Sequence, residues 1–348
     1  MADEFALDCP LPFGAYDRVV LGHGGGGRLM QRLVREVFAA AFDEPELHAG
    51  HDGAVVAGPA QLAVTTDAFV VRPLFFPGGD IGSLAVHGTV NDLAMCGARP
   101  RWLTAAFVLE EGFPLADLRR VVGSMADAAR RCGVRVIAGD TKVVERGKGD
   151  GVFITTTGLG EVMVRAPVAP ERVRPGDAVI VSGPIGDHGI AVLLARGGLG
   201  IGSDVQSDSA PVWGAVHALI EAGIALHALR DPTRGGLAAV LNEIAAAAGV
   251  GMRIQEEAVP VRPGVADACE LLGLDPMLVA CEGRFVAFVP EADADRALAV
   301  LRSLPACAEA ARVGSVLADH AGTVLLRSPM GGDRVLDLPM GEQLPRIC

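Results

Sequence analysis

The stretch Val134-Arg135-Val136-Ile137-Ala138-Gly139-Asp140-Thr141-Lys142 decides the fold, because it joins an apolar run directly to an acid and a lysine. The run 134–138 predicts a buried strand that enters the polar residues. Asp140 and Lys142 are two residues apart, so in an extended segment both side chains lie on one face. A lysine placed there can neutralise the charge that develops on a phosphate. The alternative is that Lys142 is a surface lysine.

Four more aspartates stand where a predicted strand ends or a predicted helix shows a polar face. They are Asp52 in His51-Asp52-Gly53, Asp67 in Thr65-Thr66-Asp67, Asp92 in Asn91-Asp92-Leu93-Ala94, and Asp231 in Asp231-Pro232-Thr233-Arg234-Gly235-Gly236. Carboxylates hold Mg²⁺, which bridges to phosphates. Any single one can instead be a turn or N-cap aspartate, and Asp231 is the best candidate for a cap because a predicted helix begins at 235. Together with Asp140, the five favour a metal–nucleotide site.

A glycine loop, Gly22-His23-Gly24-Gly25-Gly26-Gly27-Arg28, separates a predicted strand at 19–21 from a helical pattern that begins at Leu29. It has the G-x-G-x-x-G spacing of a dinucleotide site, but no clean second strand ends in an acid about 20 residues on. The Walker pattern fails as well, since no Gly-Lys-Ser/Thr follows. We predict that Gly24, Gly25, Gly26 and Gly27 contact phosphate; a structural turn is the alternative.

Two residues late in the chain are candidates for covalent and acid–base chemistry. Cys348 is the last residue, and a thiolate is a strong nucleophile. Glu282, in Ala280-Cys281-Glu282-Gly283, lies between two strand-like runs and is a candidate general base or a turn residue. The internal cysteines 96, 132, 269, 281 and 307 have apolar surroundings, which predicts small core residues.

The length of 348 residues predicts two domains. Strand and helix patterns alternate, which indicates an α/β or α+β layer fold. We place an N-terminal domain at 1–165, a Pro- and charge-rich linker at 166–177, a C-terminal α/β domain at 178–328 and a mobile tail at 329–348. The tail is assigned from three prolines and three glycines, which disfavour regular structure.

Composition narrows the class of protein. The formal net charge of −12 argues against a nucleic-acid or anionic-membrane partner. No apolar segment reaches the length of a membrane span, and the first residues lack the features of a signal peptide. Seven scattered cysteines without a C-x-x-C pair suggest a reducing compartment and no zinc cluster. A cytoplasmic protein is expected.

The motifs resemble, in order along the whole chain, those of the hydrogenase maturation factor HypE family. The matching stretches are the loop at 22–27, Thr66-Asp67, Asn91-Asp92-Leu93-Ala94, Gly139-Asp140-Thr141-Lys142-Val143-Val144, Asp231-Pro232-Thr233-Arg234-Gly235-Gly236 and the closing Pro345-Arg346-Ile347-Cys348. HypE is grouped with aminoimidazole ribonucleotide synthetase, selenophosphate synthetase and thiamine monophosphate kinase. The internal motifs are shared across that superfamily, and the closing motif singles out the member.

The resemblance implies a two-domain aminoimidazole ribonucleotide synthetase-like fold whose N-terminal sheet forms a dimer-spanning barrel with its twin. It implies that HypF loads a carbamoyl group on Cys348, that ATP drives its dehydration to thiocyanate, and that cyanide passes to iron on a HypC–HypD complex for [NiFe]-hydrogenase. The resemblance assigns Mg-ATP binding to the glycine loop, Thr66, Asn91, Gly139 and the five aspartates. Lys142 would stabilise the transferred phosphoryl group, and Glu282 would be the base.

Two other functions remain open from the residues. A kinase or synthetase of the same superfamily acting on a small molecule would not need Cys348. A non-catalytic ATP-binding scaffold would use the thiol only for docking.

Overall fold

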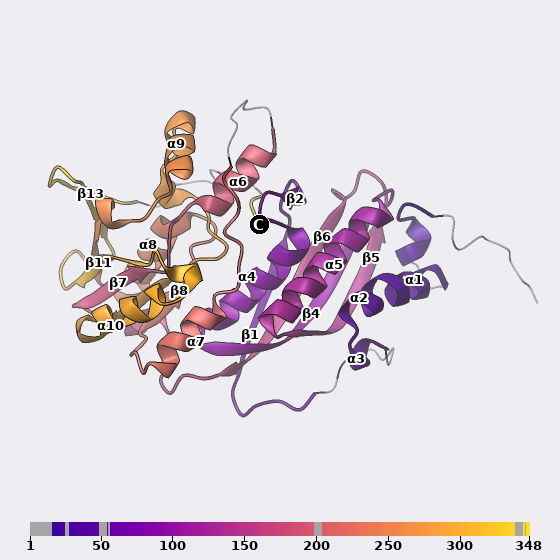
Figure 1. Cartoon of the computed structure of the whole chain (residues 1–348), viewed down its shortest axis with the longest axis horizontal. Coiled ribbons are helices and arrows are strands. Elements are labelled where there is room, and N and C mark those ends of the chain that lie inside the picture. The colour runs from indigo at the N-terminus through magenta and orange to yellow at the C-terminus, as the bar shows by residue number, and fades with distance from the viewer. Residues whose placement is uncertain are drawn as a thin grey trace, which may run out of the picture.

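The computed structural model describes residues 16–24, 28–48, 54, 56–197, 204–337, 344 and 346–348. Its first half is a four-stranded sheet in the order β1–β6–β4–β5. The strands are β1 (Leu62–Phe69), β4 (Ala98–Glu110), β5 (Arg135–Val144) and β6 (Val152–Val162). Only β4 and β5 pair in parallel. Two helices, α4 (Ile81–Met95) and α5 (Leu115–Cys132), lie along one face of this sheet (Figure 1).

The other face of the sheet carries apolar side chains that the described residues leave open. Side chains alternate between faces along each strand. Val64 is 64% exposed and Val108 is 37% exposed, whereas Phe69, Phe107 and Leu109 on the helix-covered face are buried. An uncovered apolar sheet face calls for a covering layer.

Helix α4 lies between the two halves of the chain, and 14 of its 15 residues are buried. Asp80 caps its first turn by accepting a hydrogen bond from Ser83 N at 2.9 Å. Gly82 lets α5 approach, because a Cβ there would lie 2.1 Å from the Val121 carbonyl oxygen. A surface helix would expose one polar face; α4 is buried on all sides because it has neighbours on all sides.

The second half forms a seven-stranded sheet in the order β13–β12–β9–β11–β7–β10–β8. Its strands are β7 (Asp177–Val181), β8 (Ala228–Arg230), β9 (Gly251–Gln255), β10 (Val286–Pro290), β11 (Ala311–Leu317), β12 (Val324–Arg327) and β13 (Asp333–Val335). Central strand β7 is buried on both faces. Val179 and Val181 share a core with α8, while Ala178 and Ile180 share one with α7 and α10.

Helices of the second half are α6 (Asp187–Ala195), α7 (Trp213–Glu221), α8 (Gly236–Ala248), α9 (Pro263–Leu272) and α10 (Glu291–Arg302). The remaining elements of the chain are η1 (Leu21–Gly24), α1 (Arg28–Leu33), the π-helix η2 (Val34–Ala39), α2 (Ala40–Phe42), α3 (Pro45–His48), β2 (Phe75–Phe76), β3 (Gly79–Asp80), η3 (Pro170–Arg172), η4 (Glu256–Ala258), η5 (Pro276–Leu278) and η6 (Pro305–Cys307). No helix in the described part of the chain has the length and apolar character needed to cross a bilayer.

The sequence predicted the mixed α/β two-half organisation. The apolar pattern over 115–132 predicts a helix and the run 152–162 predicts a strand, and α5 and β6 have these bounds. Two predictions differ from the structure. The strand at 19–21 is absent, and Leu21–Gly24 is a 3₁₀ turn. The region 329–348 is not all tail, since Asp333–Val335 pairs with β12 and residues 346–348 pack on the body of the protein. Neither large sheet closes on itself within the described chain, so the predicted barrel requires a second copy and stays a prediction.

Candidate functional site

Four acidic residues meet where the two halves of the chain face each other. Asp67 lies on β1 and Asp92 on α4, while Asp231 follows β8 and Glu282 precedes β10. Strands β8 and β10 are antiparallel neighbours, so the end of one and the start of the other share a sheet edge. The Cys281 N–H also donates to the Pro232 carbonyl at 2.9 Å. The sheet topology therefore brings Asp231 and Glu282 together against helix α4.

Burial raises the pKa of all four carboxyl groups, and repulsion from neighbouring acids raises it further for Asp67, Asp231 and Glu282. Burial raises the pKa of Asp231 to about 7, and the charges of Asp92 and Asp67 add to the effect. Burial raises the pKa of Glu282 well above its usual value, and the nearby aspartates raise it further. The pKa values of Asp67 and Asp92 are also raised, first by burial. Such a cluster binds protons or a cation far more readily than isolated surface acids do.

The contacts of these carboxyl groups leave binding capacity unused. Thr65 Oγ1 donates to Asp92 Oδ2 at 2.8 Å, and the Ala68 N–H donates to Asp67 Oδ1 at 2.8 Å. Glu282 Oε1 is buried and has no hydrogen-bond partner among the described residues. A buried polar atom without a partner is rare, and it points to a ligand or water that completes the site. The alternative role of Asp231, as the cap of the next helix, is not found, because Gly235 is the N-cap and α8 has no side-chain cap.

Two predicted nucleotide ligands make structural contacts. Asn91 is 1% exposed, and its side chain bonds the backbone of Ala210, Val212 and Glu282 at 2.9–3.1 Å. Both of its N–H donors and one lone pair of its oxygen are used, so it joins the two domains. Thr66 alternates with Asp67, which places it on the opposite face of β1. Its hydroxyl donates to the Thr156 carbonyl at 2.9 Å.

Asp140 and Lys142 are not in the acidic cluster. Asp67 pairs with Thr156, which pairs with Ala105, whereas Asp140 pairs with Ala106. Neighbouring residues of one strand face opposite sides, so Asp140 lies on the open face of the sheet, three strands from Asp67. Its carboxylate accepts from Lys142 Nζ at 2.7 Å, which lowers the Asp140 pKa. The two side chains therefore share a face, as their spacing predicted.

Gly24, in the described part of the glycine loop, packs against β5, the strand that carries Gly139. A Cβ at Gly24 would come within 2.8 Å of Val143 N, and a Cβ at Gly139 within 2.6 Å of the Ala105 carbonyl oxygen. Both glycines are thus required by close backbone packing. The predicted ligands Gly25, Gly26, Gly27 and Asp52 lie outside the described residues.

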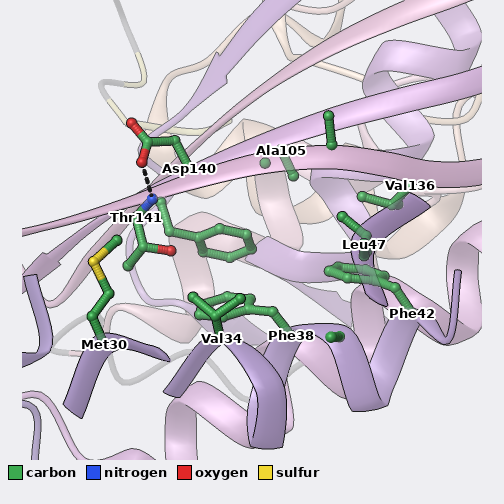
Figure 2. Close-up of a pocket in the computed structure, with 13 residues that line it drawn as sticks. Met30, Val34, Phe38, Phe42, Leu47, Ala105, Val136, Asp140 and Thr141 are labelled. Atoms are coloured by element: carbon green, nitrogen blue, oxygen red, sulfur yellow. Dashed lines mark hydrogen bonds between the residues drawn. The ribbon is translucent and has the colours of Figure 1, made fainter. Parts of the chain in front are cut away.

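An apolar cavity of about 110 Å³ lies beneath the helical segment 28–42, against β4 and β5. Figure 2 shows Val34, Phe38 and Phe42 lining it from the helical side, and Asp140 at its edge, where the Thr141 N–H donates to the carboxylate. This cavity is separate from the acidic cluster. It has little polar lining to direct a reaction.

The end of the chain is bound to the body of the protein by its backbone. The carbonyl oxygens of Arg346, Ile347 and Cys348 accept hydrogen bonds from Arg72 N at 3.2 Å, His188 Nε2 at 2.8 Å and Val70 N at 3.0 Å. Ile347 is 2% exposed and Cys348 is partly exposed. Val70 directly follows β1, so the cysteine lies beside the strand that carries Asp67.

Sequence reasoning missed two residues at this site, His188 and Asp208. Asp208 Oδ1 accepts from the Glu282 N–H at 3.1 Å. Neither residue stands in a motif, and only the fold shows their partners. Among the internal cysteines, Cys269, Cys281 and Cys307 are buried as predicted, but Cys96 is exposed and Cys132 half-buried.

The chain offers no ready-made cage for a metal. In the part that the structure describes, no three His, Cys, Asp or Glu side chains are placed to hold an ion by themselves. Mg²⁺ differs from zinc in this respect, because it keeps several waters and binds through one or two carboxylates plus phosphates. The acidic cluster fits that mode of binding.

Comparison with known proteins places the chain in a family. Models of the AIR synthase related protein match residues 50–162 (N-terminal domain) and 174–327 (C-terminal domain). Carbamoyl dehydratase HypE of Cupriavidus necator is 54% identical over 95% of both chains. A crystal structure of hydrogenase maturation protein HypE in complex with ATP superposes with a TM-score of 0.91, at 49% identity over 94% of this chain and 99% of that one.

HypE in a crystal structure of a HypE–HypF complex superposes with a TM-score of 0.78, at 47% identity over 88% of this chain and 99% of that one. The motifs, the two-domain fold and these likenesses agree. The chain belongs to the HypE family of carbamoyl dehydratases, within the proteins related to AIR synthase.

Proposed function

We propose that Cys348 carries a carbamoyl group, which this protein dehydrates with ATP to a thiocyanate that supplies the cyanide ligand of a [NiFe]-hydrogenase iron. One observation carries the assignment to Cys348. Its carbonyl is bound by Val70 N, three residues along the chain from Asp67, which is about 10 Å in an extended segment. The end of the chain and the acidic cluster are therefore neighbours.

The reaction sets two separate demands. The oxygen of the Cys348 thiocarboxamide is a poor leaving group, and phosphorylation by ATP turns it into phosphate. The nitrogen must then lose both of its protons as the C≡N bond forms. The products are ADP, phosphate and the S-cyanated cysteine. The protein must orient the phosphates beside the tail and accept protons.

The acidic cluster suits the first demand. Asp67, Asp92 and Asp231 are held between two domains with raised pKa values, which a cation lowers. We assign Mg²⁺ to these aspartates, where it would offset the repulsion between them and the nucleotide phosphates. Asp52, which lies outside the described residues, stays a predicted ligand on its motif alone.

Glu282 suits the second demand. Its backbone is held by Asn91 and Asp208, while Oε1 is buried without a partner among the described residues. Burial, and then repulsion from the neighbouring aspartates, raises the pKa of Glu282 well above its usual value. A cation bound among those aspartates would oppose this shift and favour the buried carboxylate form, which can accept a proton.

A second copy of the chain would complete the site. The open face of the first sheet, with Val64 and Val108 exposed, suits pairing with its twin as a homodimeric barrel. Closing the barrel with β5 of one copy beside β1 of the other would bring the strand that carries Lys142 next to the strand that carries the other copy's Asp67. The two residues would then lie on neighbouring strands, whereas within one chain they are three strands apart.

The partners follow from the chemistry. We propose HypF as the carbamoyl donor, which the solved HypE–HypF complex supports, and a HypC–HypD complex as the cyanide acceptor, both in the cytoplasm. The thiol must reach the donor, the ATP site and the acceptor in turn.

Mass spectrometry of the C-terminal peptide tests the function. After incubation with the carbamoyl donor system and Mg-ATP, Cys348 should first gain a carbamoyl group and then lose one water. Cys348→Ala should show neither change while it still binds Mg-ATP. A small-molecule kinase would use ATP without either mass change, and a scaffold would keep the carbamoyl group indefinitely.

A further inference from the structure

His188 stands at the meeting point of the two domains and the end of the chain. It is the second residue of α6, is 0% exposed, and stacks edge-on against Phe76 of β2 with ring centroids 5.4 Å apart. Figure 1 shows the C-terminal end beside β2, near α6. Both ring nitrogens are engaged, Nδ1 with Ser207 Oγ at 2.7 Å and Nε2 with the Ile347 carbonyl at 2.8 Å.

The partners fix the tautomer of this imidazole. A carbonyl oxygen only accepts, so Nε2 must carry the proton that binds Ile347. In the neutral ring Nδ1 is then the acceptor, and Ser207 Oγ donates to it. Burial lowers the pKa of His188, so the neutral ring is the form present near neutrality. The Ser207 hydroxyl is itself oriented, because it accepts from the Ser209 N–H at 3.0 Å.

We propose that His188 is the positioning residue that docks the carrier tail, by holding the Ile347 carbonyl and so fixing Cys348 beside the acidic cluster. This inference rests on the proposed function, in that Cys348 is taken as the carrier. Two side chains, His188 and Arg196, donate to carbonyl oxygens of the tail. The donor of His188 is wholly buried, and Ser207 orients its ring. The guanidinium of Arg196 also binds the tail, at the Arg346 carbonyl and 2.9 Å, but it is exposed.

The same loop links the dock to the candidate base. Ser207 orients His188, the next residue Asp208 binds the Glu282 backbone, and Ser209 hydrogen-bonds His87 of α4 at 3.0 Å. The tail also passes close to α6, since a Cβ at Gly189 would lie 3.3 Å from Leu344 Cδ1. The tail anchor and the base are thus held by consecutive residues of one short segment.

The first test needs no catalysis. In the full-length protein, the rate of iodoacetamide alkylation of Cys348 reports docking, and exposed Cys96 serves as the internal reference. His188→Phe, which removes the donor, should speed Cys348 alkylation about tenfold, as loss of one buried hydrogen bond predicts. His188→Gln should stay close to the parent, because its amide nitrogen can still donate. His217→Phe, at an exposed histidine of α7, is the matched control and should change nothing.

The second test works from the tail side and stays informative if His188→Phe folds poorly. Ile347→Ala weakens docking by removing a buried side chain, and it should also speed alkylation of Cys348 while Cys96 is unaffected. The double variant should be at least as fast as the faster single variant, because both changes weaken the same docking equilibrium. Parental Cys348 reactivity in both single variants overturns the proposal. So does equal acceleration of Cys96 and Cys348 in His188→Phe, which would mark a general folding residue.

A kinetic arm separates this inference from the proposed function. In protein already carbamoylated at Cys348, single-turnover loss of water should slow about tenfold in His188→Phe and recover in His188→Gln. If the parent converts and His188→Phe converts equally fast, the inference is wrong. If alkylation shows that His188 holds the tail, but the carbamoyl group on Cys348 of the parent protein is never dehydrated, then the proposed function is wrong and the docking role of His188 still stands.

Discussion

Asn91 and Glu282 lie in different domains, and Asn91 Nδ2 donates a hydrogen bond to the Glu282 backbone carbonyl at 3.1 Å. Asp208 accepts from the N–H of the same glutamate. Both backbone groups of Glu282 are therefore fixed, one from each domain. This relation explains how a glutamate next to a glycine can be held rigidly without using its own carboxyl group.

Asn91→Ala tests whether this residue is structural. The change leaves buried backbone groups of Ala210, Val212 and Glu282 without partners, so we expect a loss of about 2–4 kcal/mol in the free energy of unfolding. Urea unfolding measures this loss, and calorimetry should find ATP affinity within about twofold of the parent. Unchanged stability with lost ATP affinity would restore Asn91 as a nucleotide ligand.

Glu282→Gln separates acid–base chemistry from binding. Glutamine has the shape and charge of the protonated glutamate, so we expect a change in unfolding free energy of under about 1 kcal/mol. Conversion of the carbamoylated Cys348 should slow by about 10²–10⁴-fold, the range for loss of a general base. Mass spectrometry of the C-terminal peptide follows both species. Thiocyanate formed at the parental rate would remove Glu282 from the mechanism.

The raised pKa of Asp231, about 7, predicts a pH-dependent metal affinity. A metal ligand must be deprotonated, so Asp231 competes for a proton at pH 6 and is mostly ionised at pH 8. The Mg²⁺-dependent part of ATP affinity should therefore rise about tenfold between these pH values. Calorimetry on Asp231→Asn is the control, because ATP itself titrates equally in both proteins. Equal pH dependence in the two would show that Asp231 takes no part.

Mixed dimers test whether two copies share a site. Lys142→Ala alone should slow phosphoryl transfer by a factor equivalent to about 2–4 kcal/mol, and Asp67→Asn alone should abolish Mg-ATP binding. An equal mixture, refolded or exchanged, contains mixed dimers with one intact site and one doubly damaged site. We expect about a quarter of the parental activity. A mixture no more active than its components would place both residues in one subunit's site.

Local patterns predicted the elements well where periodicity was strong. The predicted helix 115–132 matches α5, whose apolar residues recur at helical spacing, and the predicted strand 152–162 matches β6. Short elements were missed. β8 has three residues and β13 has three, too few for a period to show, and both form because a neighbouring strand supplies their hydrogen bonds.

The sequence identified most of the acidic residues of the candidate site, but it did not show which of them lie together. Asp67, Asp92 and Asp231 were placed in one site together with Asp140, which one extra step along a strand turns to the opposite face of the sheet. The resemblance assigned Asn91 to the site together with Asp92, yet on a helix adjacent residues point about 100° apart. Asn91 thus faces the second domain. Which side chains lie together depends on packing between residues far apart in the sequence, and a short motif carries no information about such packing.

The consecutive residues Ser207, Asp208 and Ser209 contact His188, the Glu282 backbone and His87 of the first domain, and this has a thermodynamic consequence. If bound nucleotide favours the docked tail by some factor, the docked tail must favour nucleotide by the same factor. A chemical group on Cys348 that changes tail docking would then also change the affinity for ATP. A tail that is empty, carbamoylated or cyanated would thereby set when the nucleotide is held and when it is released.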